Sequence, residues 1–319
     1  MKQFTVSKQE EGQTLEKFVK KELPQIPLSF IYKLFRKKDV RINNHWEDKK
    51  KVVHTGDVIS IYISDDKLKE FETSHNIIKP SNEVEKYIIY EDDNILLINK
   101  PRGLLVQKDS ASSKALDDMV LSYLYMKGEY DPTSAFTPGP SHRLDRNTAG
   151  IVIFGKNIIT LQYLMNIMQD KSLIEKSYQA LVKGVIKEKG EINAPLKKNS
   201  LNSLVTVASI KDGGKAATTL YEPLKIYKDF TLLNVKLLTG RTHQIRVHMA
   251  YISHPVVGDN KYGDFALNKE IESKYGFKNQ FLMAYKIRFN TLEAPLDYLT
   301  NREFEVPLNH DMIQILENI

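Results

Sequence analysis

The sequence predicts an α+β fold in which a small N-terminal module precedes a larger domain with a mainly antiparallel or mixed sheet. Positive charge is concentrated in residues 1–64, which hold 13 Lys and Arg against 8 Asp and Glu, so most of the net charge of +6 lies there. Beyond residue 86, short strand-like segments follow one another and helical patterns are fewer. Strands and helices do not alternate strictly, so a doubly wound parallel sheet is not expected.

The N-terminal module is predicted to span residues 12–64, with two short helices followed by a small sheet. Apolar residues at helical spacing predict a first helix that starts near Thr14 and ends before Pro24. Ser29 is expected to cap a second helix. A strand is predicted at 40–42, a turn at Asn43 and Asn44, and a closing strand at 58–63. A module of this size would be only marginally stable alone.

The rest of the chain divides into a linker, a large domain and a tail. Residues 65–86 are polar and charged, as linkers are. The large domain is predicted at 87–308 and a tail at 309–319. The strands expected in it lie at 87–90, 95–98, 151–154, 178–182, 231–237, 283–289 and 302–306, and the helices at 115–126, 158–168 and 242–251.

The composition excludes several classes of protein. The chain contains no Cys, so a disulfide framework, an iron–sulfur cluster and a cysteine nucleophile are all excluded. Glycine-rich nucleotide-binding motifs and the G-x-S-x-G hydrolase motif are absent. No apolar run is long enough to span a membrane, and the N-terminus does not have the pattern of a signal peptide. A soluble cytoplasmic protein without membrane contact is therefore expected.

Histidines at positions 142, 243, 248 and 254 lie in the same polar segments of the large domain. His243 and His248 are five residues apart, which on a helix places them about 140° from each other, unlike the i, i+4 pair of a zinc site. We therefore expect these histidines to make hydrogen bonds and not to bind a metal.

Two segments contain the side chains that are the strongest candidates for a reactive site. In residues 141–150, SHRLDRNTAG, Asp145 lies between two arginines, whose charge favours an ionised carboxylate. In residues 238–248, LTGRTHQIRVH, a glycine turn leads to a helix start with Arg241 at its mouth. From these residues alone, a structural ion pair of Asp145 with an arginine is the favoured interpretation.

The segments HRLDRNTAG followed by IVIFGKN, then KSYQALVKG, then LLTGRTHQIRVHMAYISHPVVGDNKYG resemble the three motifs of the RluA-type pseudouridine synthases, and INKPRGLLV resembles the opening strand of that family. Residues 12–62 resemble an S4 (αL-like) RNA-binding domain, through xIYKLFRKxxVRIN and the closing GDVI. The S4-bearing, RluC-like members that act on large-subunit rRNA are the most similar in pattern. Gln107 departs from the family, in which many relatives have a His.

The resemblance implies an enzyme that isomerises uridine to pseudouridine in RNA, with no cofactor and no metal. Asp145 matches the essential Asp, which either attacks C1′ of the ribose or assists an elimination there. Arg241 is expected to pair with Asp145 and keep it anionic. Tyr178 matches the active-site Tyr, which stacks on the base and is a candidate for accepting a proton.

The resemblance also assigns residues that bind the substrate. Arg143 matches the residue that fills the gap left by the flipped uridine. Leu238, or Leu237 beside it, is expected to form an apolar wall against the uracil. Lys100 and Arg146 are expected to contact backbone phosphates or to be surface charges. The face of the S4 module that docks RNA is expected to consist of Tyr32, Lys33, Arg36, Lys37, Lys38 and Arg41.

The expected partner is structured RNA, most readily large-subunit rRNA, bound by a monomer. A tRNA-directed synthase and a non-catalytic S4-type RNA-binding factor are the alternatives, although the latter would have no use for the catalytic motifs. A nucleosidase could use Asp145, but it would normally need a second carboxylate, and none is evident in register.

Overall fold

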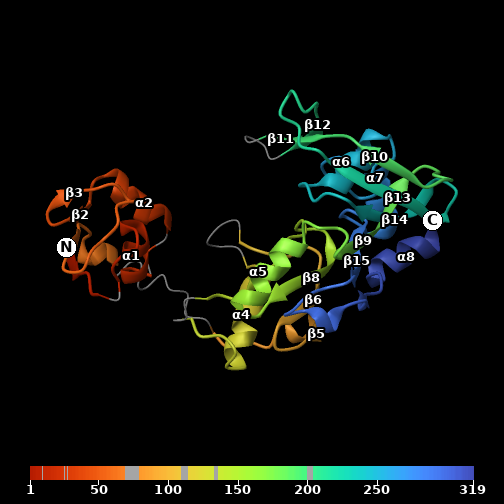
Figure 1. Cartoon of the computed structure of the whole chain (residues 1–319). Coiled ribbons are helices and arrows are strands. Elements are labelled where there is room, and N and C mark those ends of the chain that lie inside the picture. Colours follow the sequence, from red (N-terminus) through yellow and green to blue (C-terminus); the bar gives the residue numbers. More distant parts are fainter. Residues whose placement is uncertain are drawn as a thin grey trace. The chain divides into compact units, whose positions relative to one another are not determined.

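The structure, a computed structural model, describes residues 1–8, 10–24, 26, 28–68, 79–108, 114–132, 136–199 and 204–319 (Figure 1). The chain forms two compact units, Met1–Ile77 and Ile78–Ile319. The boundary between them falls inside the segment predicted to be a linker.

The N-terminal unit contains a four-stranded sheet in the order β1-β4-β2-β3, which is accompanied by the helices α1 and α2. It begins ten residues earlier than predicted, because β1 pairs with β4 along the edge of the sheet. The side chain of Thr14 accepts a hydrogen bond from the Lys17 amide and caps α1 as expected. Ser29 is not a cap, because α2 already begins at Leu28. The elements are β1 (Lys2–Thr5), α1 (Leu15–Glu22), α2 (Leu28–Arg36), β2 (Val40–Ile42), β3 (His45–Trp46) and β4 (Val58–Ile61).

The two helices and the sheet of this unit enclose one apolar core. The core includes Leu68, which is buried, and the described residues 65–68 are helical. The predicted linker therefore begins too early. Asn43 and Asn44 both have positive φ angles, as the tight turn between β2 and β3 requires. Residues 69–78 lie outside the described part of the chain.

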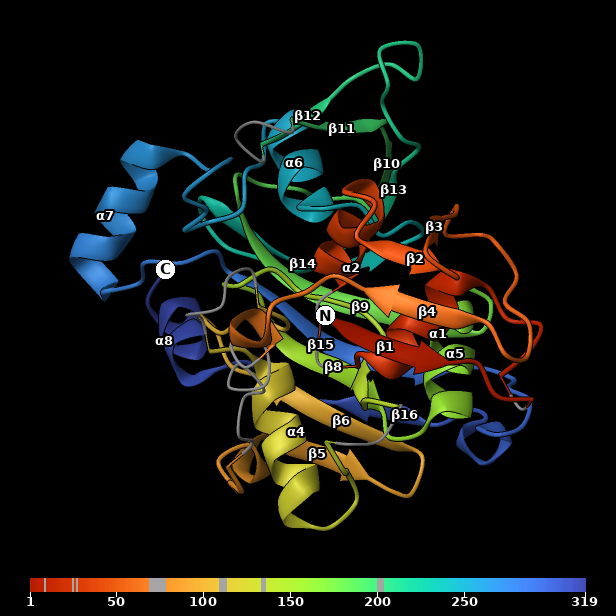
Figure 2. The same ribbon diagram turned by 90° about the vertical axis from the view of Figure 1, so that its left-hand side faces the viewer.

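The second unit is built on a ten-stranded mixed sheet, whose longest path runs β10-β13-β14-β9-β15-β8-β6-β5. Strands β15 and β8 are parallel, and the other pairs of this sheet are antiparallel. A separate hairpin of β11 and β12 lies beside α6 (Figures 1 and 2). The strands are β5 (Ile88–Glu91), β6 (Ile95–Lys100), β7 (Gly139–Pro140), β8 (Ala149–Gly155), β9 (Ile174–Lys183), β10 (Gly190–Asn193), β11 (Leu196–Lys198), β12 (Val205–Val207), β13 (Thr218–Ile226), β14 (Phe230–Leu237), β15 (Leu282–Phe289) and β16 (Glu303–Glu305).

Five α-helices of the described residues accompany this sheet: α4 (Leu116–Met126), α5 (Ile158–Ile167), α6 (Gln244–Tyr251), α7 (Phe265–Tyr275) and α8 (His310–Asn318), with short 3₁₀ turns at Glu85–Tyr87 and Asp297–Leu299. The prediction of a C-terminal tail is wrong. Residues 310–318 form α8, whose Met312 and Ile315 are buried in the core. Val84 is also buried, so the second unit begins before residue 87.

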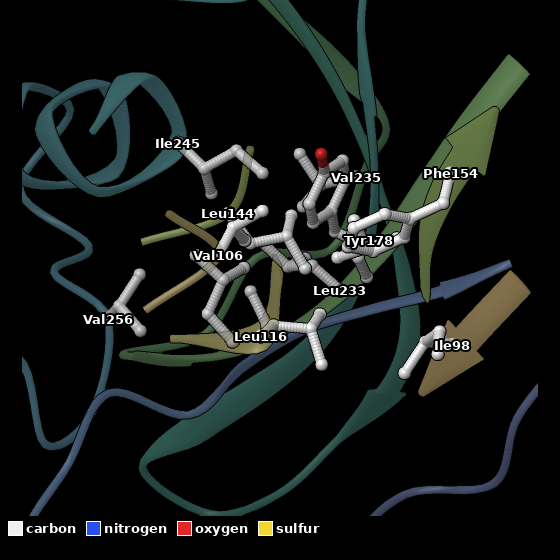
Figure 3. Packing of buried hydrophobic residues seen from close by; sticks show 14 of the residues in the cluster. Ile98, Val106, Leu116, Leu144, Phe154, Tyr178, Leu233, Val235, Ile245 and Val256 are labelled. Carbon is white, nitrogen blue, oxygen red and sulfur yellow. The ribbon is translucent and has the colours of Figure 1, made fainter. Parts of the chain in front are cut away.

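The strands of the large sheet have one core on each side, because successive side chains point to opposite faces. Leu96 and Ile98 belong to one core, and Ile95 and Leu97 to the other. The first core contains Tyr178 together with residues of β14 and α6 (Figure 3). It lies beneath the segments that the sequence marks as catalytic.

Helix α5 and the residue after it bury Leu164 and Met168, whereas Met165 is 53% exposed. Thr160, Leu164 and Ile167 are the buried residues of this helix.

Candidate active site

Asp145 lies in a loop that is fastened to the body of the second unit on both sides. Leu144 is buried in the core next to it. The Thr148 amide donates to the Asp145 carbonyl at 3.1 Å and closes a turn. Immediately afterwards Gly150 allows β8 to approach β15, because a Cβ at this position would lie 2.1 Å from the Ala284 carbonyl oxygen. The carboxylate is therefore presented from a rigid support.

Lys100 is part of that support, and the expectation that it contacts phosphate is wrong. Its side chain is fully buried at the end of β6. Its Nζ donates to the carbonyls of Pro101 at 3.0 Å, Leu104 at 2.8 Å and Arg146 at 3.0 Å. Burial lowers the pKa of Lys100 to about 7, although the charge of Asp145 acts in the opposite direction. Lys100 thus ties the Asp145 loop to the turn that follows β6.

Replacing Lys100 with Met should lower the free energy of unfolding by about 3 kcal/mol or more, because three buried carbonyls lose their donor. The folded-state pKa of Lys100 lies below its ordinary value of 10.5. The unfolded chain therefore binds more protons between about pH 7 and 10, and this group makes the wild-type protein more stable as the pH rises through that window. Urea titrations at several pH values should show this slope reduced in Lys100→Met.

The exposed Lys183→Met serves as the control for this prediction, and it should change neither the stability nor its slope with pH. Equal stability of wild type and Lys100→Met would contradict the anchoring role.

The arginine that pairs with Asp145 is Arg246, in α6. Its Nη1 donates to Asp145 Oδ2 at 2.9 Å. Its Nε and Nη2 donate to the two oxygens of Asp259 at 2.7 and 2.8 Å, and Asp259 is completely buried. Burial would raise the pKa of Asp259, but the hydrogen bonds from Arg246 and from the amides of Lys261 and Tyr262 outweigh it and lower that pKa. Asp259 therefore holds the guanidinium in the orientation in which it meets Asp145.

Arg241, which the sequence suggested for this pairing, is exposed, and its Nε donates to the Ala216 carbonyl at 3.0 Å. Its backbone amide donates to Oε1 of the buried Gln244. The amide group of Gln244 in turn donates to the Thr218 carbonyl and to the Thr219 hydroxyl. Gln244 thus fixes the turn at Gly240 to β13, while the side chain of Arg241 is exposed to solvent.

His243 also lies close to the reactive carboxylate. Its Nε2 is 3.8 Å from Asp145 Oδ2, and its Nδ1 is 2.8 Å from the Tyr262 hydroxyl. That hydroxyl accepts a hydrogen bond from the Val205 amide, which connects the β11–β12 hairpin to the site. Burial lowers the pKa of His243, with Asp145 acting against it and Arg246 with it. His243 therefore stands beside Asp145 as a neutral group near pH 7.

His248 and His254 make hydrogen bonds, as predicted. His248 is buried, with Nδ1 2.8 Å from the Thr219 hydroxyl and Nε2 2.9 Å from the Ala194 carbonyl. His254 Nδ1 lies 2.7 Å from the Lys183 carbonyl. Among the described residues, no group of three or more His, Asp or Glu side chains could hold a metal ion.

Tyr178 extends from the middle of β9 into the core that contains Leu144 and Val235 (Figure 3). Its side chain is 5% exposed. Burial raises the pKa of the phenol, and the negative charge of Asp145 raises it further. Tyr178 is therefore a neutral phenol at physiological pH, better suited to contact a base or donate a hydrogen bond than to accept a proton.

The predicted substrate-binding residues differ in exposure. Arg143 and Arg146 are both exposed on the Asp145 loop. Leu238 is 44% exposed at the end of β14, whereas Leu237 packs against the core. These positions leave Arg143 and Leu238 accessible to a substrate.

Four residues of the site, Arg246, Gln244, Asp259 and Tyr262, were not predicted from the sequence. One signal for two of them was available. In QIRVHMA polar and apolar residues alternate. A helix repeats every 3.6 residues, so this alternation distributes polar and apolar side chains around the whole helix, and no side of it is purely polar. The residues from Gln244 to Met249 are indeed all buried. A polar residue buried in this way needs a partner, and Asp259 is the partner of Arg246.

The comparison with known proteins agrees with this geometry. A model of the RNA pseudouridylate synthase family matches residues 94–251. An uncharacterized RNA pseudouridine synthase of Mycoplasma capricolum subsp. capricolum is 34% identical over 308 residues, which cover 95% of this chain and 96% of that protein. This chain belongs to the RNA pseudouridine synthases. The synthase therefore acts on uridine in RNA.

Two further relatives extend the comparison. The ribosomal large subunit pseudouridine synthase C of Haemophilus ducreyi is 32% identical to the synthase over 304 residues, which cover 92% of each chain. The solved structure of human RNA Pseudouridylate Synthase Domain Containing 4 superimposes with a TM-score of 0.58 at 19% identity and covers 73% of the synthase and 93% of the human chain. The second likeness shows the shared fold. In the described part of the synthase, no helix is long and apolar enough to cross a membrane.

Proposed function

We propose that the synthase converts specific uridines of large-subunit ribosomal RNA into pseudouridine, with Asp145 as the reactive carboxylate. The observation that carries this proposal is the anchored contact between Asp145 and Arg246, placed above the core from which Tyr178 extends. The choice of rRNA is supported by relatives named ribosomal large subunit pseudouridine synthase C, whose similarity covers both units of the chain.

In the proposed reaction the N1–C1′ bond of uridine breaks, the uracil turns, and a C5–C1′ bond forms. N1 gains a proton and C5 loses one, so the product is an isomer of the substrate. The Asp145 carboxylate either attacks C1′ or takes a proton from the ribose during an elimination, and both routes need it ionised and oriented. The hydrogen bond from Arg246 Nη1 to Oδ2 orients the carboxylate.

The surroundings of Asp145 fit a flipped nucleotide. The reacting bond cannot be reached inside a stacked helix, so the uridine must leave it. We assign Tyr178 to contact with the uracil ring, as a neutral phenol. The exposed Arg143 is assigned to the space that the base leaves behind, and Leu238 to the apolar wall.

Pseudouridine mapping tests the proposal directly. Ribosomal RNA and tRNA from cells that lack the gene should be compared with those from wild-type cells and from cells complemented with wild type or with Asp145→Asn. We expect a few rRNA positions to lose pseudouridine and only the wild-type gene to restore them. Loss confined to tRNA would contradict the choice of substrate, and rescue by Asp145→Asn would contradict the mechanism.

We further propose that the N-terminal unit is an S4 RNA-binding domain that docks the synthase on structured RNA. Five basic or aromatic side chains of the proposed face are exposed, and Arg41 is partly exposed. Lys38 Nζ lies 5.0 Å from the ring centre of the exposed Trp46, and Arg41 Cζ lies 4.8 Å from that of Tyr62. Cations above exposed aromatic rings can contact phosphates and stack on unpaired bases.

Changing Arg36, Lys37 and Lys38 to Gln should weaken RNA binding by an amount that shrinks as salt rises. The slope of log affinity against log salt should fall by about one unit for each phosphate that is no longer bound, while the single-turnover rate at saturating RNA stays near that of the wild type. Lys274→Gln, an exposed change in α7, is the control. An unchanged slope in the triple variant would contradict docking by this face.

We propose that the synthase works as a monomer in the cytoplasm. No step of the proposed reaction requires a second copy, and the ribosomal RNA of the proposed substrate is a cytoplasmic molecule in bacteria such as those of the relatives. Sedimentation of the purified synthase at the concentration of the activity assay would test the first statement.

A further inference from the structure

Tyr262, in the segment between α6 and α7, touches both side chains that face the reactive carboxylate. Its hydroxyl lies 2.8 Å from His243 Nδ1, and its ring centre lies 5.2 Å from Arg246 Cζ. His243 Nε2 and Arg246 Nη1 lie 3.8 and 2.9 Å from Asp145 Oδ2. Tyr262 is thus one residue away from Asp145 by two routes, although the proposed reaction assigns it no step.

Tyr262 is itself held by contacts with several elements. Its backbone amide donates to Oδ1 of the buried Asp259 at 3.1 Å. Its side chain packs against the small apolar cluster that contains Leu196 and Val205 of the β11–β12 hairpin. Its hydroxyl accepts a hydrogen bond from the Val205 amide at 2.9 Å. The oxygen of Tyr262 therefore has a fixed position, and its single proton has to point elsewhere.

That proton is directed at His243. Among the described residues, His243 Nδ1 is the acceptor that lies within hydrogen-bond distance of the Tyr262 hydroxyl. Burial lowers the pKa of His243, so the ring is neutral, and a neutral imidazole that accepts at Nδ1 carries its proton on Nε2. The opposite tautomer would direct the lone pair of Nε2 at the negative Asp145 Oδ2. Both arguments place an N–H donor on the side of His243 that faces Asp145.

The backbone of His243 supports a positioned side chain. Its φ of 54° is in the left-handed region, which residues with a side chain seldom adopt. Its carbonyl accepts a hydrogen bond from the Val247 amide at 3.0 Å in the first turn of α6. A residue in such a conformation persists where its surroundings determine it, and such residues cluster at reactive sites.

We propose that Tyr262 is a positioning residue of the synthase, which keeps His243 in the tautomer that donates from Nε2 toward Asp145. The inference rests on the proposed role of Asp145 as the reactive carboxylate. The separation of 3.8 Å between Nε2 and Oδ2 exceeds a hydrogen bond. Catalytic hydrogen bonds are often long in a free enzyme and shorten in its complex with substrate. The donor then holds the carboxylate in the orientation in which it meets the ribose.

The first test is kinetic and uses Tyr262→Phe, which removes the hydroxyl and keeps the ring beside Arg246. We expect its single-turnover rate at saturating RNA to fall about tenfold, as for one hydrogen bond lost from the transition state, with RNA affinity unchanged. His243→Asn should lower the rate at least as much, and Asn tolerates the left-handed backbone. The double variant should be no slower than His243→Asn, because the hydroxyl acts through the imidazole.

Tyr275→Phe is the matched control for these rates. It also removes one phenolic hydroxyl, which donates to the Asn318 carbonyl at 2.9 Å and thereby joins α7 to the end of α8. Its rate should equal that of the wild type. All rates are compared at a temperature below the melting transition of every variant, so that only folded synthase is measured.

The second test reads the tautomer by nitrogen NMR of synthase labelled in its histidines. The chemical shifts of the two ring nitrogens depend on which of them carries the proton, and the signals missing in His243→Asn identify those of His243. The wild type should carry the proton on Nε2, and the form protonated at Nδ1 should gain population in Tyr262→Phe. A role in packing alone would leave the tautomer unchanged. The wild-type spectrum keeps this test decisive even if a variant folds poorly.

The inference would be overturned by a wild-type His243 that is protonated at Nδ1, or by an unchanged rate in Tyr262→Phe. A double variant in which both losses of rate add in full would also overturn it, because the two residues would then act separately. Failure of the proposed function is distinguishable from these results. An active Asp145→Asn would remove the role of Asp145, whereas the NMR measurement needs no substrate and no turnover.

Discussion

Asp145→Asn should abolish turnover, with a single-turnover rate at least about 10⁴-fold below that of the wild type. The change keeps the volume of the side chain and removes the carboxylate that has to attack or deprotonate the ribose. RNA affinity should stay within about threefold of the wild type, because Asp145 contributes no positive charge to phosphate binding. Tritium release from uridine labelled at C5 measures the rate, and a filter-binding titration measures the affinity.

The fold should tolerate this variant. The loop keeps its anchors at Leu144 and Lys100, which do not depend on the carboxylate. A circular dichroism melt close to that of the wild type is the control. A residual rate of one tenth or more would show that another group carries the reaction.

Arg246→Met should have the second largest effect, on both stability and rate. It leaves the buried carboxylate of Asp259 without its partner, at a cost of about 3 to 5 kcal/mol in the free energy of unfolding. It also frees Asp145 from the contact that orients it. Arg241→Met is the matched comparison, and it should leave stability nearly unchanged because Arg241 is exposed and donates only to one backbone carbonyl.

The double variant Arg246→Met/Asp259→Asn separates the two effects. Without the unpaired buried charge it should recover much of the stability, but the rate should remain low because Asp145 still has no arginine. Urea denaturation and single-turnover tritium release give the two quantities. A rate near that of the wild type in the double variant, or a larger loss in Arg241→Met than in Arg246→Met, would contradict the assignment of Arg246.

The sequence predicted those elements whose apolar residues follow a clear strand or helix pattern. The strands at β6, β8, β14 and β15 are apolar runs, and α4 has an apolar face of ordinary length. Strand β13 escaped prediction because few of its side chains are buried and Pro223 interrupts the pattern. Helix α7 escaped because Ile271 alone is buried in it. Strand β13 is therefore formed by its pairing with β10 and β14 more than by local preference.

The candidate site was predicted in outline, but its pairing was not. Tyr178 lies in the core that also contains Leu144, the residue next to Asp145. Which of two arginines five positions apart reaches Asp145 depends on where α6 begins. His243 adopts a left-handed conformation with a φ of 54° just before the helix, and the chain turns there. Arg246 then faces Asp145 and Asp259 from within the helix. Lys100 could not be placed either, because a sequence does not show whether a lysine is buried.

The division of Arg246 between two acids makes the two oxygens of Asp145 unequal. Two of its nitrogens are committed to Asp259, so Nη1 alone reaches Asp145, and it meets Oδ2. His243 also faces Oδ2. Both neighbours therefore lie at Oδ2, and in the proposed reaction Oδ1 is the atom that would approach the sugar. If both oxygens accepted hydrogen bonds from the protein, neither would be available to react. In this arrangement Oδ2 is held by the protein, and Oδ1 remains available to the substrate.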